Sequence, residues 1–263
     1  MKLFRIDRSI NRKEIGRYPQ CEDVIIHGNA DAEDAFKYQG KYGPVVGQPP
    51  LPEPILHKSA KLTDYLSGTG IGDDKYKIIS LRFYEFLASY LGPHQTWPIQ
   101  VSNSELRFDR RKLQYVVKDA AKLKKYDYMI LHISYSSHRL INYPESEFFI
   151  DRRERYMENA YDLPSYVAKY GTDLKRIYSH EEYISFTRYL RYHKGGNILV
   201  LKKLVINLSD NKESIFRIMT PMNNLSGYYV TETLRTKIEA EGFTGMAFTP
   251  LEELNPHVVI KTR

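Results

Sequence analysis

Eight histidines make metal binding the first chemistry to test against this sequence. His132 and His138 lie six residues apart, and strand alternation would place His132 and Ser134 on the same face. The metalloprotease motif H-E-x-x-H is absent, and no third ligand follows at a familiar spacing. His180 is followed by two glutamates, but an acidic helix start has the same pattern. We therefore interpret the histidines as structural residues and predict no metal site.

The sequence supports nucleophilic catalysis no better than metal binding. A serine hydrolase exposes its serine on a sharp elbow, usually within G-x-S-x-G, and the chain lacks this motif. Cys21 is the single cysteine and has no base near it in the sequence, so we expect a small buried apolar side chain. Gly68, Gly70 and Gly72 resemble a phosphate cradle only superficially, because they depart from G-x-G-x-x-G and no P-loop lysine follows.

Neighbouring carboxylates are the remaining candidates for acid–base chemistry. The pairs are Asp73 with Asp74, Glu145 with Glu147, and Glu252 with Glu253. All of them lie in polar stretches, so we expect their pKa values to stay near the ordinary range. The tripeptide Glu-x-Lys, which a metal nuclease would place on a strand, does not occur. Without a catalytic set, the sequence favours a binding protein over an enzyme and predicts no cofactor.

The charge balance is mildly basic, with 39 Lys and Arg against 32 Asp and Glu. Basic runs at residues 107–112 and 122–125 are short, and we favour a solvated face over a nucleic-acid groove. A single cysteine fits a reducing compartment. Charged residues interrupt the first residues of the chain, and no apolar run reaches membrane-spanning length. We therefore expect a soluble cytoplasmic protein without membrane contact.

Residues 215–249 give the clearest local architecture. They contain two short β-forming runs, a helix-like segment and a final β-forming run. Thr231 is the expected N-cap of the helix, and Gly242 is its expected stop. The core positions predicted for this unit are Phe216, Leu234, Ile238, Phe243 and Phe248.

Weaker signals place the other elements. Strands are expected at residues 2–6, 23–27, 97–101, 126–135, 139–142, 147–150 and 198–208. Helices are expected at residues 78–91, capped by Ser80, and at residues 180–193, and the charged stretch from residue 152 is a weaker helix candidate. Residues 28–54 are dense in proline and are expected to form an extended irregular loop packed across the domain.

These elements predict an α+β fold with mixed or antiparallel sheets, a few packed helices and a C-terminal strand-helix-strand unit. We divide the chain into an N-terminal α+β region at residues 1–150, a helical insertion at residues 151–196 and a C-terminal α+β region at residues 197–263. The first and last regions are expected to form one compact unit.

The C-terminal unit resembles a bacterial immunity-protein family known as Imm11 or DUF1629. The resemblance lies in the strand IFRI and the run YYVTETLRTKIEAEGFTGMAFTPL. Upstream, residues 79–83 followed by WPIQV, and then YDYMILHISYSSHRLINYPES, are similar to family segments in the right order. Asn142 stands where the family usually has an aspartate. The likeness covers most of residues 79–251 and leaves residues 151–196 unmatched.

The resemblance implies an antitoxin of a polymorphic toxin or type VI secretion system. Such a protein binds a cognate toxin encoded by a neighbouring gene and blocks it stoichiometrically, without turnover. Aromatic and arginine side chains commonly dominate tight interfaces, and the basic balance would suit an acidic partner surface. We expect the contacts within residues 151–192, and the candidate anchors are Arg152, Arg153, Arg155, Tyr156, Tyr161 and Tyr166. A solvated linker surface is the alternative for this stretch.

Two other functions stay open. One is a nucleic-acid-directed or metal-dependent enzyme that uses His132, His138 and the basic runs. The other is an adaptor module of a secretion apparatus, which would bind a machine component instead of a toxin. The oligomeric state is left open.

Overall fold

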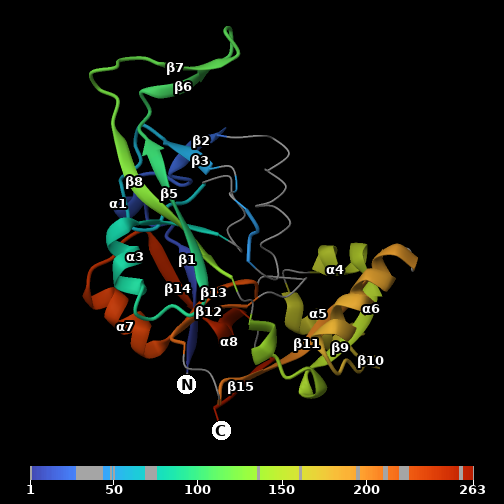
Figure 1. The fold of residues 1–263 in the computed structure, drawn as a ribbon. Coiled ribbons are helices and arrows are strands. Elements are labelled where there is room, and N and C mark those ends of the chain that lie inside the picture. Colours follow the sequence, from blue (N-terminus) through green and yellow to red (C-terminus); the bar gives the residue numbers. More distant parts are fainter. Residues whose placement is uncertain are drawn as a thin grey trace.

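The computed structural model describes residues 2–27, 44–47, 49, 51–68, 76–134, 137–159, 162–193, 196–209, 213–218, 225–254 and 257–262. Within these ranges the protein is an α+β fold of mixed and antiparallel sheets with packed helices, which confirms the predicted fold class. Figure 1 shows a central body, a two-stranded hairpin that projects from one end of it, and a helical lobe at its side.

One four-stranded sheet joins the two ends of the chain. Its strands, in spatial order, are β12 (Ile215–Ile218), β13 (Gly227–Thr231), β1 (Leu3–Arg8) and β14 (Met246–Pro250). Strand β1 pairs antiparallel with both β13 and β14, so the first strand lies between two strands from the end of the chain. Helix α7 (Glu232–Ala240) connects these two strands, and α8 (Leu251–Leu254) follows β14.

The local predictions for this unit are confirmed at its helix ends. Thr231 caps α7, because its hydroxyl oxygen accepts a hydrogen bond from the Leu234 amide at 3.4 Å. Gly242 follows the helix with a φ of 69°, a conformation that suits glycine. Of the five predicted core side chains, Phe216, Leu234 and Ile238 are buried. Phe243 and Phe248 are partly buried and pack against the same core, so they lie at its edge.

A five-stranded sheet forms the upper part of the body. Its strands, in spatial order, are β2 (Cys21–His27), β3 (Leu51–Leu56), β5 (His94–Ser102), β8 (Lys125–Ile133) and β4 (Lys77–Ser80). The short helix α1 (Arg12–Ile15) precedes β2, and α3 (Leu81–Leu87) follows β4. Strands β5 and β8 pair from His94–Ile133 to Ser102–Lys125 and lead into the projecting hairpin.

Strand β3 corrects the prediction of an irregular loop at residues 51–54. Pro52 and Pro54 lie two apart, so both lack a backbone N–H toward the same edge of the strand. The strand pairs with β2 along its length but with β5 only at Ile55–Ser102, and we infer that the prolines face β5. Of the rest of the predicted loop, residues 28–43, 48 and 50 lie outside the described residues.

Helix α3 is shorter than predicted, because its first residues form strand β4 and pair with β8. Ser80 still caps it, accepting a hydrogen bond from the Phe83 amide at 3.1 Å. The helix buries Phe83 and Leu87, whereas Leu81 is 44% exposed. The predicted strand at residues 139–142 was also wrong, since a 3₁₀ helix (Ser137–Leu140) and a single bridge from Ile141 to Ile206 occupy that stretch.

The third sheet supports the helical lobe. Its strands, in spatial order, are β10 (Leu174–Lys175), β9 (Glu147–Arg152), β11 (Asn197–Asn207) and β15 (Val258–Lys261). Strand β11 is one long strand, as the sequence allowed, with an irregular register between Leu201 and Lys203. The lobe helices are α4 (Arg153–Asn159), α5 (Leu163–Tyr170) and α6 (His180–His193), and a 3₁₀ turn (Tyr143–Glu145) precedes β9.

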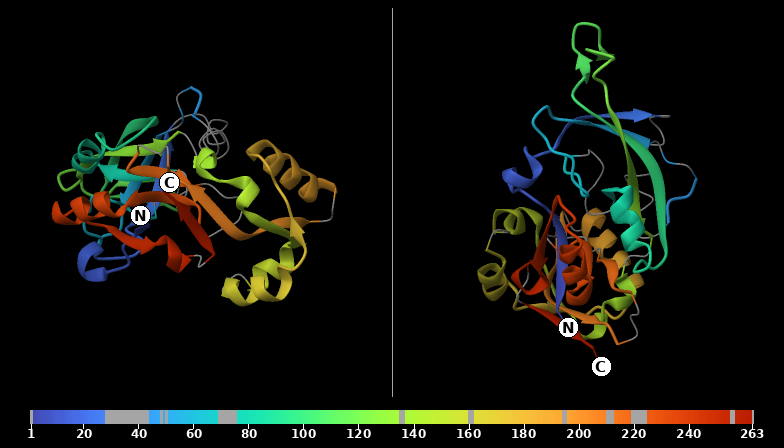
Figure 2. Two further views of the ribbon diagram at one scale, coloured as in Figure 1. Left: turned by 90° about the horizontal axis from the view of Figure 1, so that it is seen from below. Right: turned by 90° about the vertical axis from the view of Figure 1, so that its left-hand side faces the viewer.

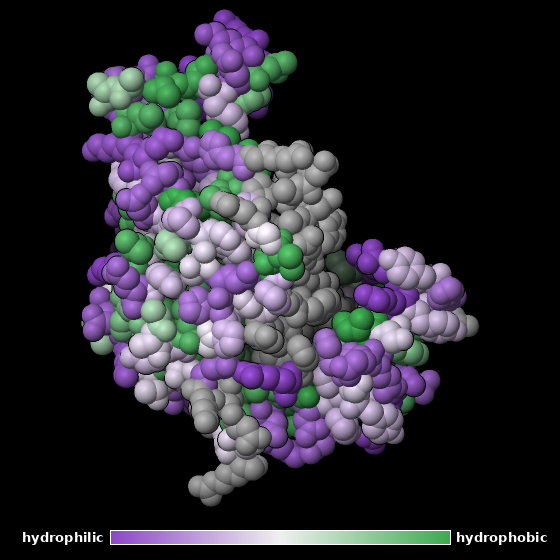
Figure 3. Space-filling view, in the orientation of Figure 1, coloured by the Kyte–Doolittle hydropathy of each residue, from purple (hydrophilic) through white to green (hydrophobic). Residues whose placement is uncertain are grey.

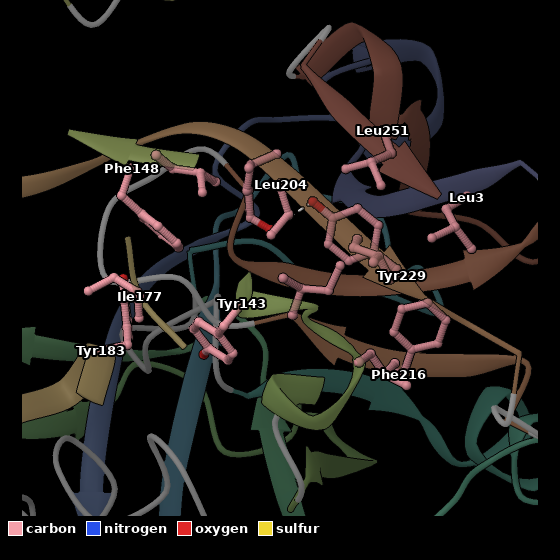
Figure 4. Packing of buried hydrophobic residues seen from close by; sticks show 14 of the residues in the cluster. Leu3, Tyr143, Phe148, Ile177, Tyr183, Leu204, Phe216, Tyr229 and Leu251 are labelled. Carbon is pink, nitrogen blue, oxygen red and sulfur yellow. Dashed lines mark hydrogen bonds between the residues drawn. The ribbon is translucent and has the colours of Figure 1, made fainter. Parts of the chain in front are cut away.

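The lobe helices cover opposite faces of this sheet (Figure 2). Neighbouring residues of a strand point to opposite faces. Phe148 accordingly packs with the α6 residues Tyr183 and Leu190, whereas Phe149 packs with Tyr166 and other side chains of α4 and α5. The face under α6 continues into the main core, as Figure 4 shows for side chains that converge from β1, β9, β11, β12 and β13. The predicted division at residues 150 and 196 stays a prediction.

Candidate interaction surfaces

Residues 103–125, here called the basic arm, project from the end of strands β5 and β8 (Figures 1 and 2). Strands β6 (Leu106–Asp109) and β7 (Gln114–Val117) form an antiparallel hairpin within it. Asn103 closes its base, because its backbone amide donates to the Lys124 carbonyl and its side-chain amide donates to the Lys122 carbonyl, each at 3.0 Å. At the tip, Asp109 accepts hydrogen bonds from the amides of Arg111 and Lys112 at 2.9 and 3.3 Å.

The basic arm concentrates the positive charge of the chain. It holds eight Lys and Arg against three Asp and Glu, a net charge of +5, whereas the whole chain carries +7. The two basic runs both belong to this arm: residues 107–112 lie in β6 and the turn after it, and residues 122–125 lie at the base of the arm. Within the described residues, six of its basic side chains make no ion pair: Arg107, Arg110, Arg111, Lys112, Lys118 and Lys124.

Apolar side chains lie among these charges, as the mixed colours at the top of Figure 3 illustrate. Phe108, Leu113 and Val117 are 42%, 77% and 43% exposed. Phe108 and Tyr115 meet edge to face across the hairpin, with ring centroids 5.2 Å apart. Exposed apolar groups beside cations are typical of a contact surface, because they can be desolvated while the charges orient the partner.

Glu53 fixes the base of the basic arm. Its carboxylate accepts a hydrogen bond from the Ser102 hydroxyl at 2.6 Å and lies 2.8 Å from both Lys125 Nζ and His27 Nε2. Burial disfavours the charged form of Glu53, but the hydrogen bonds from Lys125, Ser102 and His27 outweigh it and hold the pKa of the carboxyl below its ordinary value. The Glu53 carboxylate therefore stays ionised and holds the base of the basic arm in place.

Residues 147–193, here called the aromatic lobe, contain the predicted toxin contacts. Tyr156 and Tyr166 are 8% and 2% exposed, so their rings are not presented at the surface. The Tyr166 hydroxyl donates a hydrogen bond to Asp151, and burial together with that carboxylate raises the pKa of Tyr166. Arg155 lies 3.3 Å from Asp151 and stacks over the ring of Tyr170. These side chains hold the lobe together.

The other predicted toxin contacts are either exposed or outside the described residues. Arg152 and Arg153 are exposed at the junction of β9 and α4, where a partner could reach them. Tyr161 lies outside the described residues. The exposed aromatic side chains of the lobe instead lie elsewhere: Tyr178, Tyr189 and Tyr192 are 66%, 44% and 70% exposed.

The outer face of α6 forms a shallow hollow of about 560 Å³. Arg188, Tyr189 and Tyr192 line it, and Tyr189 stacks on His193 with ring centroids 5.5 Å apart. This face carries arginine and tyrosine side chains, which are common in interfaces. The lobe as a whole, however, contains both positive and negative charges. The aromatic lobe has eight basic and eight acidic residues in its sequence.

Where the structure describes them, several of the residues first considered for chemistry are buried or contact neighbouring side chains. His132 is fully buried, with its Nδ1 3.3 Å from a guanidinium nitrogen of Arg217, itself buried. His180 Nδ1 lies 2.9 Å from the Tyr143 hydroxyl. Cys21 is 2% exposed, and burial raises the pKa of its thiol to about 12, which keeps it protonated. The side chain of His138 is outside the described part, and that part contains no group of three potential metal ligands.

One carboxylate departs from its predicted behaviour. Glu145 was expected to have an ordinary pKa, but the Lys261 ammonium, 2.5 Å away, lowers it. Glu147 forms a looser pair with Lys202 at 3.6 Å. Glu252 and Glu253 are exposed, and Asp73 and Asp74 lie outside the described residues. These pairings are surface ion pairs, which stabilise a fold only weakly.

The basic arm was not predicted from the sequence as a single surface. A signal was available, because the basic runs flank a possible hairpin with an Asp-initiated turn and β-forming Tyr115, Val116 and Val117. Glu53 gave no signal, since a glutamate between two prolines has no pattern of a buried charge. Comparison with known proteins found no family model that matches the chain and no curated protein that matches it in sequence. None of the described helices has the length and apolar character needed to cross a membrane.

Proposed function

We propose that the protein is an immunity protein that neutralises a cognate toxin by stoichiometric binding, and that the basic arm is its principal contact. The observation that carries the proposal is the projecting hairpin, which combines six basic side chains, each free of ion pairs to described residues, with exposed Phe108, Leu113 and Val117. The resemblance of most of residues 79–251, without residues 151–196, to a bacterial immunity-protein family supports the same function.

The arm suits occlusion of an acidic cleft. A two-stranded ribbon is narrow, so it can enter a recess that a flat sheet face cannot. Its charges would speed association with a negatively charged partner, and this steering weakens with ionic strength. Its apolar side chains would supply the desolvated contacts that slow dissociation. The proposed partner therefore has an acidic active-site cleft, and the arm blocks substrate entry to it.

Co-expression with the product of the adjacent gene tests the proposal. The wild-type protein should relieve the toxicity of that product and form a one-to-one complex with it. The variant Arg110→Glu/Arg111→Glu/Lys112→Glu should bind at least about tenfold more weakly, because charge repulsion replaces attraction at the arm tip. Its association rate should also lose most of its dependence on salt.

A matched control changes the same number of charges on the body. Arg12, Arg17 and Lys58 are exposed and make no ion pair to the described residues, so Arg12→Glu/Arg17→Glu/Lys58→Glu has the same net charge as the arm variant. This control should bind like the wild type. If both variants weaken binding equally, net charge rather than the arm drives association. If the wild-type protein neither binds nor protects, the proposed function is wrong.

The same arm favours one competing function, which is binding to nucleic acid. Basic β-ribbons can enter a groove, and unpaired Lys and Arg side chains neutralise phosphates. Fluorescence anisotropy with a labelled DNA duplex and a labelled RNA hairpin at about 150 mM salt separates the two functions. Tight nucleic-acid binding that the arm variant abolishes would replace the toxin as the partner.

A further inference from the structure

A second positively charged site lies on the body, where β1, β4 and β13 meet. It is a pocket of about 370 Å³. Its lining includes the charged side chains of Arg5, Asp7, Arg8 and Lys77 and the ring of Tyr18. The volume lies within the range of pockets that hold small organic ligands and exceeds what a bare inorganic ion fills.

Lys77 is the unusual member of this site. It is the first residue of β4 and is only 8% exposed. Its ammonium lies 5.1 Å from the ring centroid of Tyr65 and 5.3 Å from that of Tyr228. Among the described residues, no hydrogen-bond acceptor or carboxylate pairs with this ammonium. The side chain is largely covered, two ring faces contact its ammonium, and the ammonium lines the pocket, where a bound anion could reach it.

The neighbouring charges do not neutralise Lys77. Asp7 is the one carboxylate among the lining residues that the structure describes. Its Oδ1 accepts a hydrogen bond from Arg5 Nε at 2.7 Å, and its Oδ2 accepts one from the Thr249 hydroxyl at 2.6 Å. Both carboxylate oxygens are therefore engaged. Among the described lining residues, the charged side chains are those of Arg5, Arg8 and Lys77 and that of Asp7.

The glycine at position 227 leaves room for the Arg5 side chain at this pocket. A Cβ atom on Gly227 would lie 2.9 Å from Cδ of Arg5, so glycine at this position lets the arginine stem lie against β13. Arg5 is thereby held across the sheet with its guanidinium at the pocket. A planar guanidinium beside a point-like ammonium is a combination that recognises phosphate oxygens.

We propose that this pocket binds a small molecule that carries a phosphate group. Lys77 and the two arginines would hold the phosphate oxygens, and the ring of Tyr18, 43% exposed at the pocket, would contact the organic part of the ligand. The ligand would provide a negative charge for the Lys77 ammonium, which lines the pocket. This site uses none of the residues of the basic arm, so it can exist whether or not the protein neutralises a toxin.

Isothermal titration calorimetry with the full chain tests the site. The probes are pyrophosphate and adenosine monophosphate, with adenosine as the uncharged control. Both phosphate compounds should bind saturably, and adenosine should bind at least about tenfold more weakly, since it lacks the charge-assisted hydrogen bonds. Stronger binding of the nucleotide than of pyrophosphate would show that the ring of Tyr18 contributes.

The variant Lys77→Met keeps the apolar stem and removes the charge. It should weaken binding of both phosphate compounds at least about tenfold, whereas Lys58→Met, at an exposed lysine, should leave it unchanged. If Lys77→Met does not fold, Arg8→Gln provides the same test, with the melting temperature measured with and without pyrophosphate. The arm variant should bind the phosphate compounds like the wild type.

Two results would overturn this proposal. One is the absence of saturable binding of pyrophosphate and adenosine monophosphate to the wild-type chain. The other is unchanged phosphate binding in folded Lys77→Met. Weaker binding of the protein partner to Lys77→Met, without any phosphate binding by the wild type, would mean that the pocket receives an acidic side chain of that partner instead.

Discussion

The basic arm and the aromatic lobe both project from the body, but they use their side chains in opposite ways. The lobe contains eleven Tyr and Phe residues in its sequence and no net charge, and most of its described rings pack on both faces of its sheet. The arm contains only two aromatic residues, a net charge of +5 and, within its fully described length, a single buried side chain, Leu106. Aromatic richness therefore marks a core here, and clustered charge marks the surface that we propose for contact.

The largest expected difference between the two regions is in stability. Leu190 is 2% exposed under α6, so Leu190→Ala should lower the free energy of unfolding by about 2–5 kcal/mol. Leu113→Ala, at the 77% exposed arm tip, should change it by less than about 0.5 kcal/mol. Urea denaturation measures both. Equal losses would mean that the arm has a core of its own.

Acid should loosen the base of the arm through Glu53. The folded pKa of Glu53 lies below its unfolded value of about 4.3, so its stabilisation is present above that pH and is lost as the pH falls through the folded pKa. Glu53→Gln should cost about 1–3 kcal/mol at pH 7 and less at pH ~3. Urea denaturation at both values checks this, with exposed Glu85→Gln as the control. A cost that does not depend on pH would rule out the charge of Glu53 as the cause.

For affinity toward the partner, we expect the larger effect in the arm and the smaller effect in the lobe. Phe108→Ala at the arm should weaken the toxin complex by about 1–2 kcal/mol, the usual loss for an aromatic contact of moderate importance. The matched change Tyr178→Ala removes a more exposed ring of the lobe and should leave the affinity unchanged. Surface plasmon resonance with the purified toxin measures both. A larger loss for Tyr178→Ala would move the principal contact to the lobe.

The smallest effect is expected for the exposed arginines first predicted as toxin contacts. Arg152→Glu/Arg153→Glu should change the affinity by less than about threefold, because rim charges contribute little once the main contact is elsewhere. The same measurement with the arm variant provides the comparison. If the two lobe substitutions weaken binding more than the three arm substitutions, the sequence-based placement of the interface was right and the arm is secondary.

The sequence predicted the elements whose signal is local. Runs of β-forming residues placed β5 and β8, and capping chemistry placed Ser80 and Thr231. Signals that depend on a tertiary neighbour failed. Pro52 and Pro54 argued against a strand, yet β3 tolerates them because it pairs fully along only one of its edges. The apolar run at the start of α3 looked helical, but pairing with β8 makes it a strand.

The candidate sites were harder to predict, because they too depend on residues that are distant in the sequence. Residues 107–112 and 122–125 form one surface only because β6 pairs with β7 and Asn103 closes the base. The burial of Tyr166 depends on Phe149 and Val200, which come from two different strands. Nothing near Lys77 in the sequence indicates that rings from residues 65 and 228 will enclose its ammonium.

The position of β1 has a consequence for how the protein is made. Leu3 pairs with Thr231, and Phe4 pairs with Pro250, so the partners of β1 leave the ribosome long after it does. At typical rates of translation the delay is on the order of tens of seconds. During that interval the apolar side chains of β1 and its open edges have no sheet to join. Chaperone capture of the nascent chain, and sensitivity of the yield to the speed of synthesis, are therefore expected properties of this fold.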